Sequence, residues 1–371
     1  ETEKRMQRLF NIFVIFSASQ ISQMVCSISA YNDRTSNCEN ANPSGRVWAT
    51  YVVENKKELD RNKRAPSFVL TRWYERLGNN FMEIRRALKY AICCRGKLEI
   101  RHYNPYLPKL KRYLDFSGSK TFPSSDYQSP SECSQGREDN FFFISKTFPE
   151  PQCKFDEYGA LQYLIFGNEY PYGCASSHIE CANNLEKSLV VHIRSGDIFD
   201  NNPHPPYRQP PVVFYQQIFQ SRHWERILLV TSIEKNNSYN PVWNYFLDRD
   251  NIANIINTTE TSLIYQMSSS LQDDMKTMWC ARYFVSSSST LSNMILHTGP
   301  FLKEIYGVKD SLFGSCSNYG KRIVEQKIKC HQIILPGYYA SDWVNSPRQR
   351  ERIITYKIPK TNNLEVNSSG K

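Results

Sequence analysis

One apolar segment runs directly into side chains that could hold an anion. Residues 190–197 read VVHIRSGD, so a short buried strand is predicted to end at His192, with Arg194 and Gly196 just beyond it. In open α/β sheets, ligands bind beyond the carboxyl ends of the strands. A guanidinium there can hold two phosphate oxygens and stays charged, and a glycine lets backbone approach the ligand. The alternatives are a surface ion pair for Arg194, a buried hydrogen-bonded His192 and a turn cap at Asp197.

Two further segments place polar groups where helices are predicted to begin. Residues 75–81 read ERLGNNF, where a strand passes through a glycine-bearing loop into a helix. Residues 271–290 read LQDDMKTMWCARYFVSSSST, where a short strand leads into a Ser/Thr-rich turn and the last helix. Backbone N–H groups at the start of a helix bind phosphate. For residues 75–81 the alternative is a turn glycine followed by an asparagine cap. For residues 271–290 the alternatives are a flexible Ser turn with Thr290 as helix cap, and Asp273 and Asp274 as favourable charges in the first turn of a helix.

The elements that must position these residues alternate between strand and helix. Strands are expected at 67–71, 97–102, 188–193, 226–231, 251–256 and 283–286. Helices are expected at 81–94, 158–166, 211–219, 241–247, 268–279 and 291–297. The first helix is predicted to begin at Asn80 as N-cap, with Glu83 completing a capping box. This rhythm indicates an α/β fold of parallel βαβ units in a doubly wound sheet, and it weakens after Gly299.

The length of 371 residues fits two domains of about 150 residues each. We expect five segments: a leader (1–30), a polar stem or linker (31–65), an N-terminal domain (66–186), a C-terminal domain (187–355) and a disordered tail (356–371). Residues 103–155 are predicted to be loops with short elements, and residues 167–186 a bridged loop between the domains.

Several features favour the secretory route, in the lumen of the ER or Golgi. The uncharged run 9–32 is too polar for a confident membrane span and favours a signal peptide or a weak single anchor. Eleven cysteines are typical of a secretory protein, and none has zinc-site spacing. Three pairs are close enough in sequence for local bridges, without fixing the connectivity: Cys133/Cys153, Cys174/Cys181 and Cys316/Cys330. Sequons stand at Asn236, Asn257 and Asn367.

The net charge of +10 is concentrated before residue 115. It fits either a generally basic surface or attraction to an anion such as a nucleotide diphosphate or an acidic membrane. No aromatic RNA-binding signature accompanies it, so no nucleic-acid partner is expected.

Together the three segments resemble a known family. HIRSGD resembles the HxRxGD-type motif shared by α1,2-, α1,6- and protein O-fucosyltransferases. ERLGNNF is similar to the RLGNQ-F segment near the start of the α1,2-fucosyltransferase domain, and residues 271–290 resemble the late fucosyltransferase segment with D-x-x-x-x-x-C spacing. The resemblance spans about residues 70–300 in the family's order. The chain departs from it at Ser195, where many relatives carry a second arginine.

The resemblance implies a GT-B-like fold, with two Rossmann-like domains facing a cleft, the first on the acceptor side and the second binding the nucleotide sugar. It implies an inverting, metal-independent transfer of L-fucose from GDP-fucose to a glycan or glycoprotein hydroxyl, with no further cofactor. Arg194 would stabilise the GDP leaving group, His192 would orient the phosphate or sugar, and Glu75 or Asp197 would be the base. The expected donor-binding residues are Arg194, Gly78, Asn79, Asp273, Asp274, Ser287, Ser288, Ser289 and Thr290.

Two other functions stay open. A catalytically inactive relative that binds glycan or nucleotide is kept open by Ser195. A metal-dependent glycosyltransferase would use the triplet Asp248–Asp250, an Asp-x-Asp sequence, to hold Mn²⁺ at the phosphates. The sequence contains no GxGxxG, P-loop, HExxH or GxSxG pattern, which argues against hydride transfer, Walker-type NTP hydrolysis and serine hydrolysis.

Overall fold

The fold is taken from a computed structural model of the chain. It describes residues 51–61, 63–73, 77–105, 107, 110–118, 133, 137–139, 157–166, 185–205, 207–231, 240–256, 260–267, 271–309 and 327–359. Within these ranges no helix is both long enough and apolar enough to cross a membrane. The leader, most of the stem and residues 360–371 of the expected tail lie outside them.

A small sheet forms the N-terminal part of the molecule. It contains four strands in the order β3-β2-β1-β4: β1 (Ser67–Leu70), β2 (Lys97–Ile100), β3 (Tyr113–Asp115) and β4 (Arg137–Asp139). β1 runs parallel to β2 and β4, and β3 is antiparallel to β2. The accompanying helices are α4 (Lys56–Leu59), α5 (Leu77–Cys93) and α7 (Glu157–Phe166). Because α5 connects β1 to β2, the helix begins at the carboxyl end of β1.

A larger, wholly parallel sheet forms the C-terminal part, with the strand order β10-β9-β8-β5-β6-β7. Its strands are β5 (Ser188–His192), β6 (Arg226–Thr231), β7 (Ser262–Met267), β8 (Tyr283–Val285), β9 (Glu304–Val308) and β10 (Lys329–Ile333). On one side of the sheet β5 is followed outward by β6 and β7, and on the other side β8 is followed outward by β9 and β10. The strand order therefore reverses between β5 and β8, which is the topological switch point of a doubly wound sheet.

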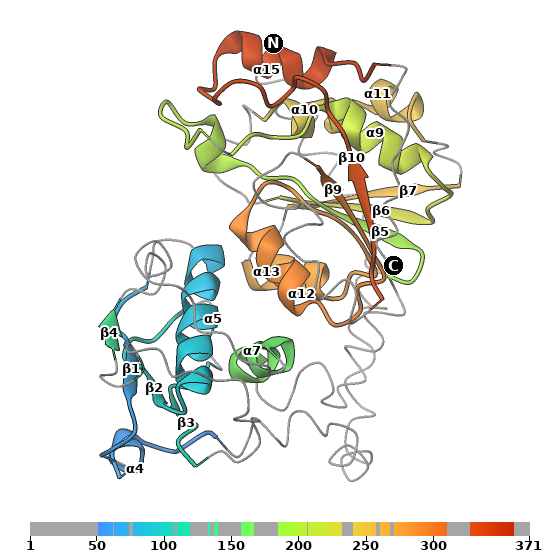
Figure 1. Cartoon of the computed structure of the whole chain (residues 1–371). Coiled ribbons are helices and arrows are strands. Elements are labelled where there is room, and N and C mark those ends of the chain that lie inside the picture. The colour runs from blue at the N-terminus through green and yellow to red at the C-terminus, as the bar shows by residue number, and fades with distance from the viewer. Residues whose placement is uncertain are drawn as a thin grey trace, which may run out of the picture.

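Helices cover both faces of the larger sheet (Figure 1). One face carries α12 (Leu271–Trp279) and α13 (Thr290–Thr298). The other carries α9 (Val212–Gln220), α10 (Pro241–Leu247), α11 (Arg249–Ala253) and α15 (Pro347–Thr355). Residues alternate between the faces along β5, since Leu189 and Val191 join one hydrophobic cluster and Val190 the other. All three are fully buried, as expected for a strand covered on both faces.

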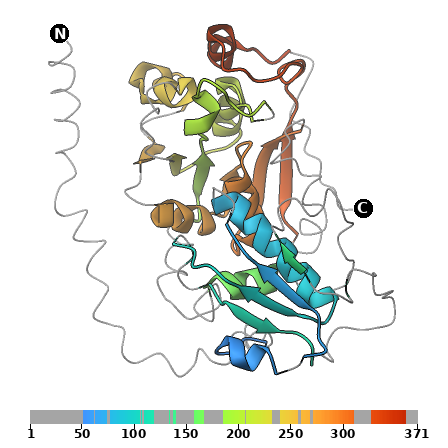
Figure 2. The same cartoon turned by 90° about the vertical axis from the view of Figure 1, so that its left-hand side faces the viewer.

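The two sheets are joined by packing between helices. α5 of the smaller sheet lies against α13 of the larger one, and the turned view in Figure 2 again shows α5 between the sheets. A single hydrophobic cluster runs from Phe68 on β1 through Phe81 on α5 to Ile295 on α13 and Phe284 on β8. The described parts of both sheets therefore share one continuous core.

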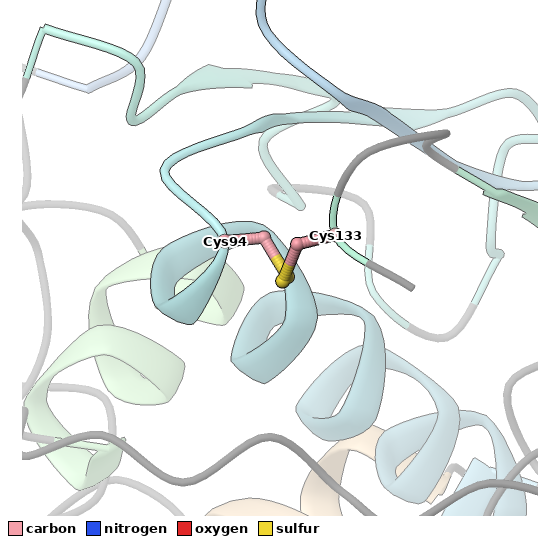
Figure 3. Close-up of a disulfide and its surroundings, with 2 residues drawn as sticks. All are labelled: Cys94 and Cys133. Carbon is pink, nitrogen blue, oxygen red and sulfur yellow. A yellow bond between two sulfur atoms is a disulfide. The ribbon is translucent and has the colours of Figure 1, made fainter. Parts of the chain in front are cut away.

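A disulfide joins Cys94, directly after α5, to Cys133, with their Cα atoms 5.2 Å apart (Figure 3). It ties the end of α5 to the chain before β4. The predicted Cys133/Cys153 bridge is therefore wrong, because Cys133 is already paired. Cys93, Cys280 and Cys330 are also disulfide-bonded. Cys153, Cys174, Cys181 and Cys316 lie outside the described residues, so the other two predicted bridges stay predictions.

The expected α/β class with parallel sheets is confirmed, while the two-domain GT-B-like arrangement and its boundaries stay predictions. The strands at 188–193 and 226–231 and the helix at 241–247 are confirmed. The predicted strand at 251–256 is wrong: its first residues belong to α11, which begins after its cap Asp248, and the strand β7 comes later. The start of the first helix is also wrong, since α5 begins at Leu77 and places Asn80 inside the helix.

Candidate functional site

The switch point brings together two of the three segments singled out from the sequence. β5 ends at His192 and leads into the motif Arg194–Asp197, while the neighbouring β8 ends at Val285 and leads into Ser286–Ser289. Since both strands are parallel, their carboxyl ends lie at the same edge. The crevice at such a point is where open α/β sheets bind ligands.

Arg194 is held across this point by three different groups. Its Nη1 donates to the backbone oxygen of Ser288 at 2.9 Å, and its Nη2 donates to both carboxylate oxygens of Asp197 at 3.2 and 2.9 Å. Its guanidinium also lies 4.0 Å from the ring centre of Tyr207. Only 11% of the side chain is exposed. The arginine is thus fixed in one orientation, which favours a role in recognition over a loose surface ion pair.

The backbone of the motif is held by a buried neutral network. Asn240 Nδ2 donates to the backbone oxygen of Arg194 at 3.0 Å and to Ser195 Oγ at 2.7 Å. Thr231, at the end of β6, also donates to Ser195 Oγ. Asn240 Oδ1 accepts from the N–H groups of Val242 and Trp243 and so caps α10. Ser195 is therefore turned into the protein toward Asn240, and its side chain does not determine the charge beside the guanidinium.

Gly196 and Asp197 form the turn after the arginine. Gly196 has φ of 74°, a conformation that favours glycine, and begins a short 3-10 helix, Gly196–Phe199. This backbone requirement accounts for the glycine of the motif without a ligand. Asp197 lies in the first turn of that helix, and its carboxylate accepts from Arg194 Nη2.

His192 connects the two strand ends and is neutral. Its Nδ1 lies 2.7 Å from Ser292 Oγ and 2.8 Å from Ser287 Oγ. Burial, followed by the nearby positive charge of Arg194, lowers the pKa of His192 to about 3. A histidine with this pKa is uncharged at neutral pH and a poor general base. These contacts fit the buried hydrogen-bonded alternative, with His192 fixing the serine turn.

The serine turn is buried and rigidly bonded, so the alternative of a flexible turn is wrong. Ser289, and not Thr290, is the N-cap of α13 and accepts from Leu291 N at 3.1 Å. Ser287 N donates to Ser292 Oγ. Ser288 is 2% exposed, and its Oγ has no hydrogen-bond partner among the described residues. An unpaired buried hydroxyl at a helix start, beside an arginine, is the kind of group that a bound anion would satisfy.

The third segment reaches the same place through α5. A Cβ atom on Gly78 would lie 2.4 Å from Thr290 Oγ1 and 2.5 Å from Leu291 N. The first turns of α5 and α13 are therefore in direct contact, and Gly78 is required by this contact. The neighbouring Asn79 has a buried Oδ1 without a hydrogen-bond partner among the described residues. Glu75 lies outside the described residues, and its predicted role as a base stays a prediction.

The acidic pair on α12 is divided between two environments. Asp274 is buried and accepts from Gln266 Nε2 at 3.3 Å, near the carboxyl end of β7. Asp273 is exposed to solvent. Because β7 lies two strands from β5 on the same sheet edge, Asp274 is the better placed of the two for a ligand at the switch point.

The Asp-x-Asp triplet has a structural role instead. Asp248 lies between α10 and α11 and caps α11 by accepting from Asp250 N at 2.9 Å, while Arg249 and Asp250 are the first two residues of α11. Within the described ranges no group of three His, Cys, Asp or Glu side chains is arranged to hold a metal ion. The triplet therefore offers no support for the metal-dependent alternative.

A C-terminal segment that was not predicted, residues 338–345, is hydrogen-bonded to the motif turn and to the loop that carries Tyr207. Trp343 Nε1 donates to the backbone oxygen of Ile198 at 2.6 Å, and Asn345 Nδ2 donates to that of Phe199 at 2.6 Å. Arg208 is buried and donates to the backbone oxygens of Tyr338 and Ser341. The segment thereby fixes the loop that carries Tyr207. The only signal in the sequence is an aromatic group, YYASDW, in a region without clear periodicity.

Comparison with known proteins gives a distant likeness to solved structures. No family model matches the chain. No curated protein matches it either. Among solved structures, the chain is similar to a mutant of Arabidopsis thaliana FUT1 in complex with GDP, at 11% identity and a TM-score of 0.32. That match covers 73% of this chain and 75% of the plant chain. At this identity and TM-score the likeness does not assign a function, and the chemistry has to be argued from the site itself.

Proposed function

We propose that this chain is a glycosyltransferase that transfers L-fucose from GDP-fucose to a hydroxyl of a glycan or glycoprotein, with inversion and without a metal ion. The observation that carries the proposal is the meeting of Arg194 with the start of α13 at the switch point. There the guanidinium bonds to Ser288 O, and Ser288 Oγ is buried without a hydrogen-bond partner among the described residues. The resemblance of HIRSGD, ERLGNNF and residues 271–290 to fucosyltransferase segments supports the choice of donor.

The chemistry follows from where charge develops. Breaking the bond between fucose and GDP leaves a sugar that resembles an oxocarbenium ion and a diphosphate with additional negative charge. Fixed cationic and N–H donors stabilise such a leaving group without reorganising. Arg194 supplies the cation, and the first turn of α13 supplies N–H groups and the Ser288 hydroxyl. Asn79, at the first turn of α5, would contact the same ligand.

The remaining assignments are part of the proposal. Asp274 would contact the guanosine, since it lies on the same sheet edge as the phosphate-binding groups. Ser287, Ser289 and Thr290 would shape the phosphate-binding turn, and His192 would hold that turn in place. Asp197 is paired with Arg194, which makes it an orienting group and a weaker choice of base than Glu75. We place the enzyme in the secretory pathway because of its cysteines and sequons.

The expected effect of Arg194→Ala tests the proposal. We expect the variant to fold, as judged by circular dichroism, and to lose about 10²–10³-fold in GDP-fucose turnover, or roughly 2.7–4 kcal/mol. GDP binding, measured by calorimetry, should weaken in parallel. The matched control is Arg348→Ala, an exposed arginine on α15. A folded Arg194→Ala protein with unchanged turnover and GDP affinity would overturn the assignment, and activity that is lost in EDTA would contradict the metal-free mechanism.

The alternative of an inactive relative loses its main argument. It rested on Ser195 as a missing positive charge at the phosphates. Because Ser195 Oγ is bonded to Asn240 and Thr231 inside the protein, the residue at this position does not face the guanidinium of Arg194.

A further inference from the structure

Three segments meet at the carboxyl edge of the smaller sheet. Residues 71–73 follow β1, residues 101–105 follow β2, and residues 111–112 precede the antiparallel β3. Trp73 Nε1 donates to the backbone oxygens of His102 and Tyr103 at 3.0 and 3.2 Å. Arg112 donates through Nε to Ile100 O at 3.0 Å and through Nη2 to Arg101 O. These bonds fix the three segments side by side, and we call this surface the basic edge.

The charge of the basic edge has one sign. Its segments contain four arginine or lysine residues, one histidine and no aspartate or glutamate. Arg72, Arg101 and Arg112 are exposed to solvent. Glu99, two residues before Arg101, lies 3.8 Å from Arg101 Nε, but it also accepts from Lys56 Nζ at 2.9 Å. Among the described residues, Glu99 is thus shared between Arg101 and Lys56, and the charged side chains of the three segments are all cationic or histidine.

The basic edge also contains an exposed aromatic side chain, Tyr103. Tyr103 is 63% exposed, the highest value among the exposed large hydrophobic residues of the described ranges. Trp73 is half-buried next to it and packs against the core. Aromatic faces bind the C–H faces of sugar rings, and guanidinium groups bind carboxylates and sulfates with two parallel hydrogen bonds. An oligosaccharide that carries acidic groups satisfies both features at once.

The basic edge also lies on the side of the sheet that faces the proposed donor site. α5 begins at the carboxyl end of β1, and its first turn touches the first turn of α13 at Gly78. We propose that the basic edge binds an acidic oligosaccharide, with uronate or sulfate groups, as the acceptor of the transfer reaction. The sugar lies on Tyr103 and its anionic groups pair with Arg72 and Arg101. As an acceptor site it rests on the proposed function, whereas binding of the sugar can be measured by itself.

Direct binding tests the chemical class. The probes are a chondroitin sulfate hexasaccharide, its unsulfated counterpart and the neutral chitohexaose, measured by calorimetry with the full chain. We expect the acidic probes to bind at least about tenfold more tightly than chitohexaose, which corresponds to ~1.4 kcal/mol. The difference between the two acidic probes shows whether sulfate adds to carboxylate. Equal binding of all three would overturn the proposal, and so would tighter binding of oligothymidylate or of phosphatidylserine vesicles.

Variants locate the binding to this surface. Arg72→Gln/Arg101→Gln should weaken the acidic probes by about tenfold, and Tyr103→Ala by about fivefold, while Tyr103→Phe stays within about twofold of the unaltered chain because it keeps the ring. The matched charge control is Lys329→Gln/Arg348→Gln, two exposed cations of the larger sheet and α15. Equal losses in the control and in Arg72→Gln/Arg101→Gln would refute a specific site.

The two proposals fail in different ways. If the acidic probes bind as expected but GDP does not, the basic edge is a sugar-binding surface and the proposed transferase function is wrong. If GDP binds and Arg194→Ala abolishes that binding while acidic and neutral sugars behave alike, the proposed function stands and the inference about the acceptor is wrong.

Discussion

Asn240 performs two tasks that a single substitution can separate. Its Oδ1 caps α10, while its Nδ2 holds the backbone oxygen of Arg194 and the hydroxyl of Ser195. The residue is fully buried. Serine is an equally good N-cap, but its shorter side chain does not reach the arginine. Asn240→Ser therefore keeps the cap and removes the two bonds that position the motif.

The structure gives the expected magnitude. Two buried hydrogen bonds are lost at roughly 1 kcal/mol each, so we expect the free energy of unfolding to fall by about 2 kcal/mol. Asn240→Ala also loses the cap, which adds about 1 kcal/mol. Since the backbone of Arg194 is released, GDP should bind about tenfold more weakly to Asn240→Ser, equivalent to ~1.4 kcal/mol.

Urea denaturation measures the stability of each variant, and calorimetry measures its affinity for GDP. The matched control is Asp248→Ser, because Asp248 Oδ1 caps α11 without touching the motif. We expect the control to change neither quantity by more than about 0.5 kcal/mol. If Asn240 were only a helix cap, Asn240→Ser would equal the unaltered chain in both measurements, and that result would refute the positioning role. A loss of stability with unchanged GDP affinity would show that the bonds to the motif are structural alone.

Two further predictions concern the packing and the charges around the sheets. Gly78→Ala should lower the free energy of unfolding by about 1–3 kcal/mol, because the added Cβ would meet Thr290 Oγ1 at 2.4 Å. Urea denaturation measures this loss, and the control is Gly118→Ala, where nothing lies within 4 Å of the added Cβ. A loss of stability in Gly78→Ala no larger than that in Gly118→Ala would contradict the contact. At the amino end of the larger sheet, a hydrogen bond from His331 and the charge of Arg222 outweigh desolvation and lower the pKa of Glu304 to about 2. Because this pKa lies below the usual 4.5, the stabilisation is present above pH 4.5 and is lost as the pH falls toward 2. As the pH falls from 4.5 toward 2, urea denaturation should therefore show a smaller loss of unfolding free energy for Glu304→Gln than for the unaltered chain. An equal loss in both proteins would count against the ion pair.

The parts of the fold that could be predicted are those with strong local signals. RILLVT at 226–231 is a continuous apolar run bounded by polar residues, and the helix at 241–247 has an Asn cap followed by proline. The segment 251–256 was ambiguous, because NIANII fits a strand or a helix by periodicity alone. The hydrogen bond from Asp250 N to Asp248 Oδ1 favours the helix at the start of this segment. The sequence shows an aspartate at this position but not whether its side chain forms that bond.

Some parts of the candidate site could likewise be predicted from the sequence, and others could not. The strand end at Arg194 and the helix start after Ser286–Ser289 could be placed from the sequence, because both follow short apolar strands. Their contact could not, since it depends on β5 and β8 being neighbours, which is a property of the whole sheet. Tyr207 was missed for a related reason. Its position is set by Arg208 and the C-terminal aromatic residues, which are more than 100 residues away along the chain.

The shared core has a consequence for how the protein moves and unfolds. Among the described residues, one apolar cluster continues from Phe68 in the smaller sheet to Phe284 in the larger sheet, so the two sheets cannot separate without breaking it. A hinge opening would expose apolar surface at a cost of about 25 cal/mol per Å², so rigid-body closure around a substrate is an expensive motion here. Entry and exit of ligands would then depend on the loops at the strand ends. For the same reason, both sheets should melt together in one cooperative transition.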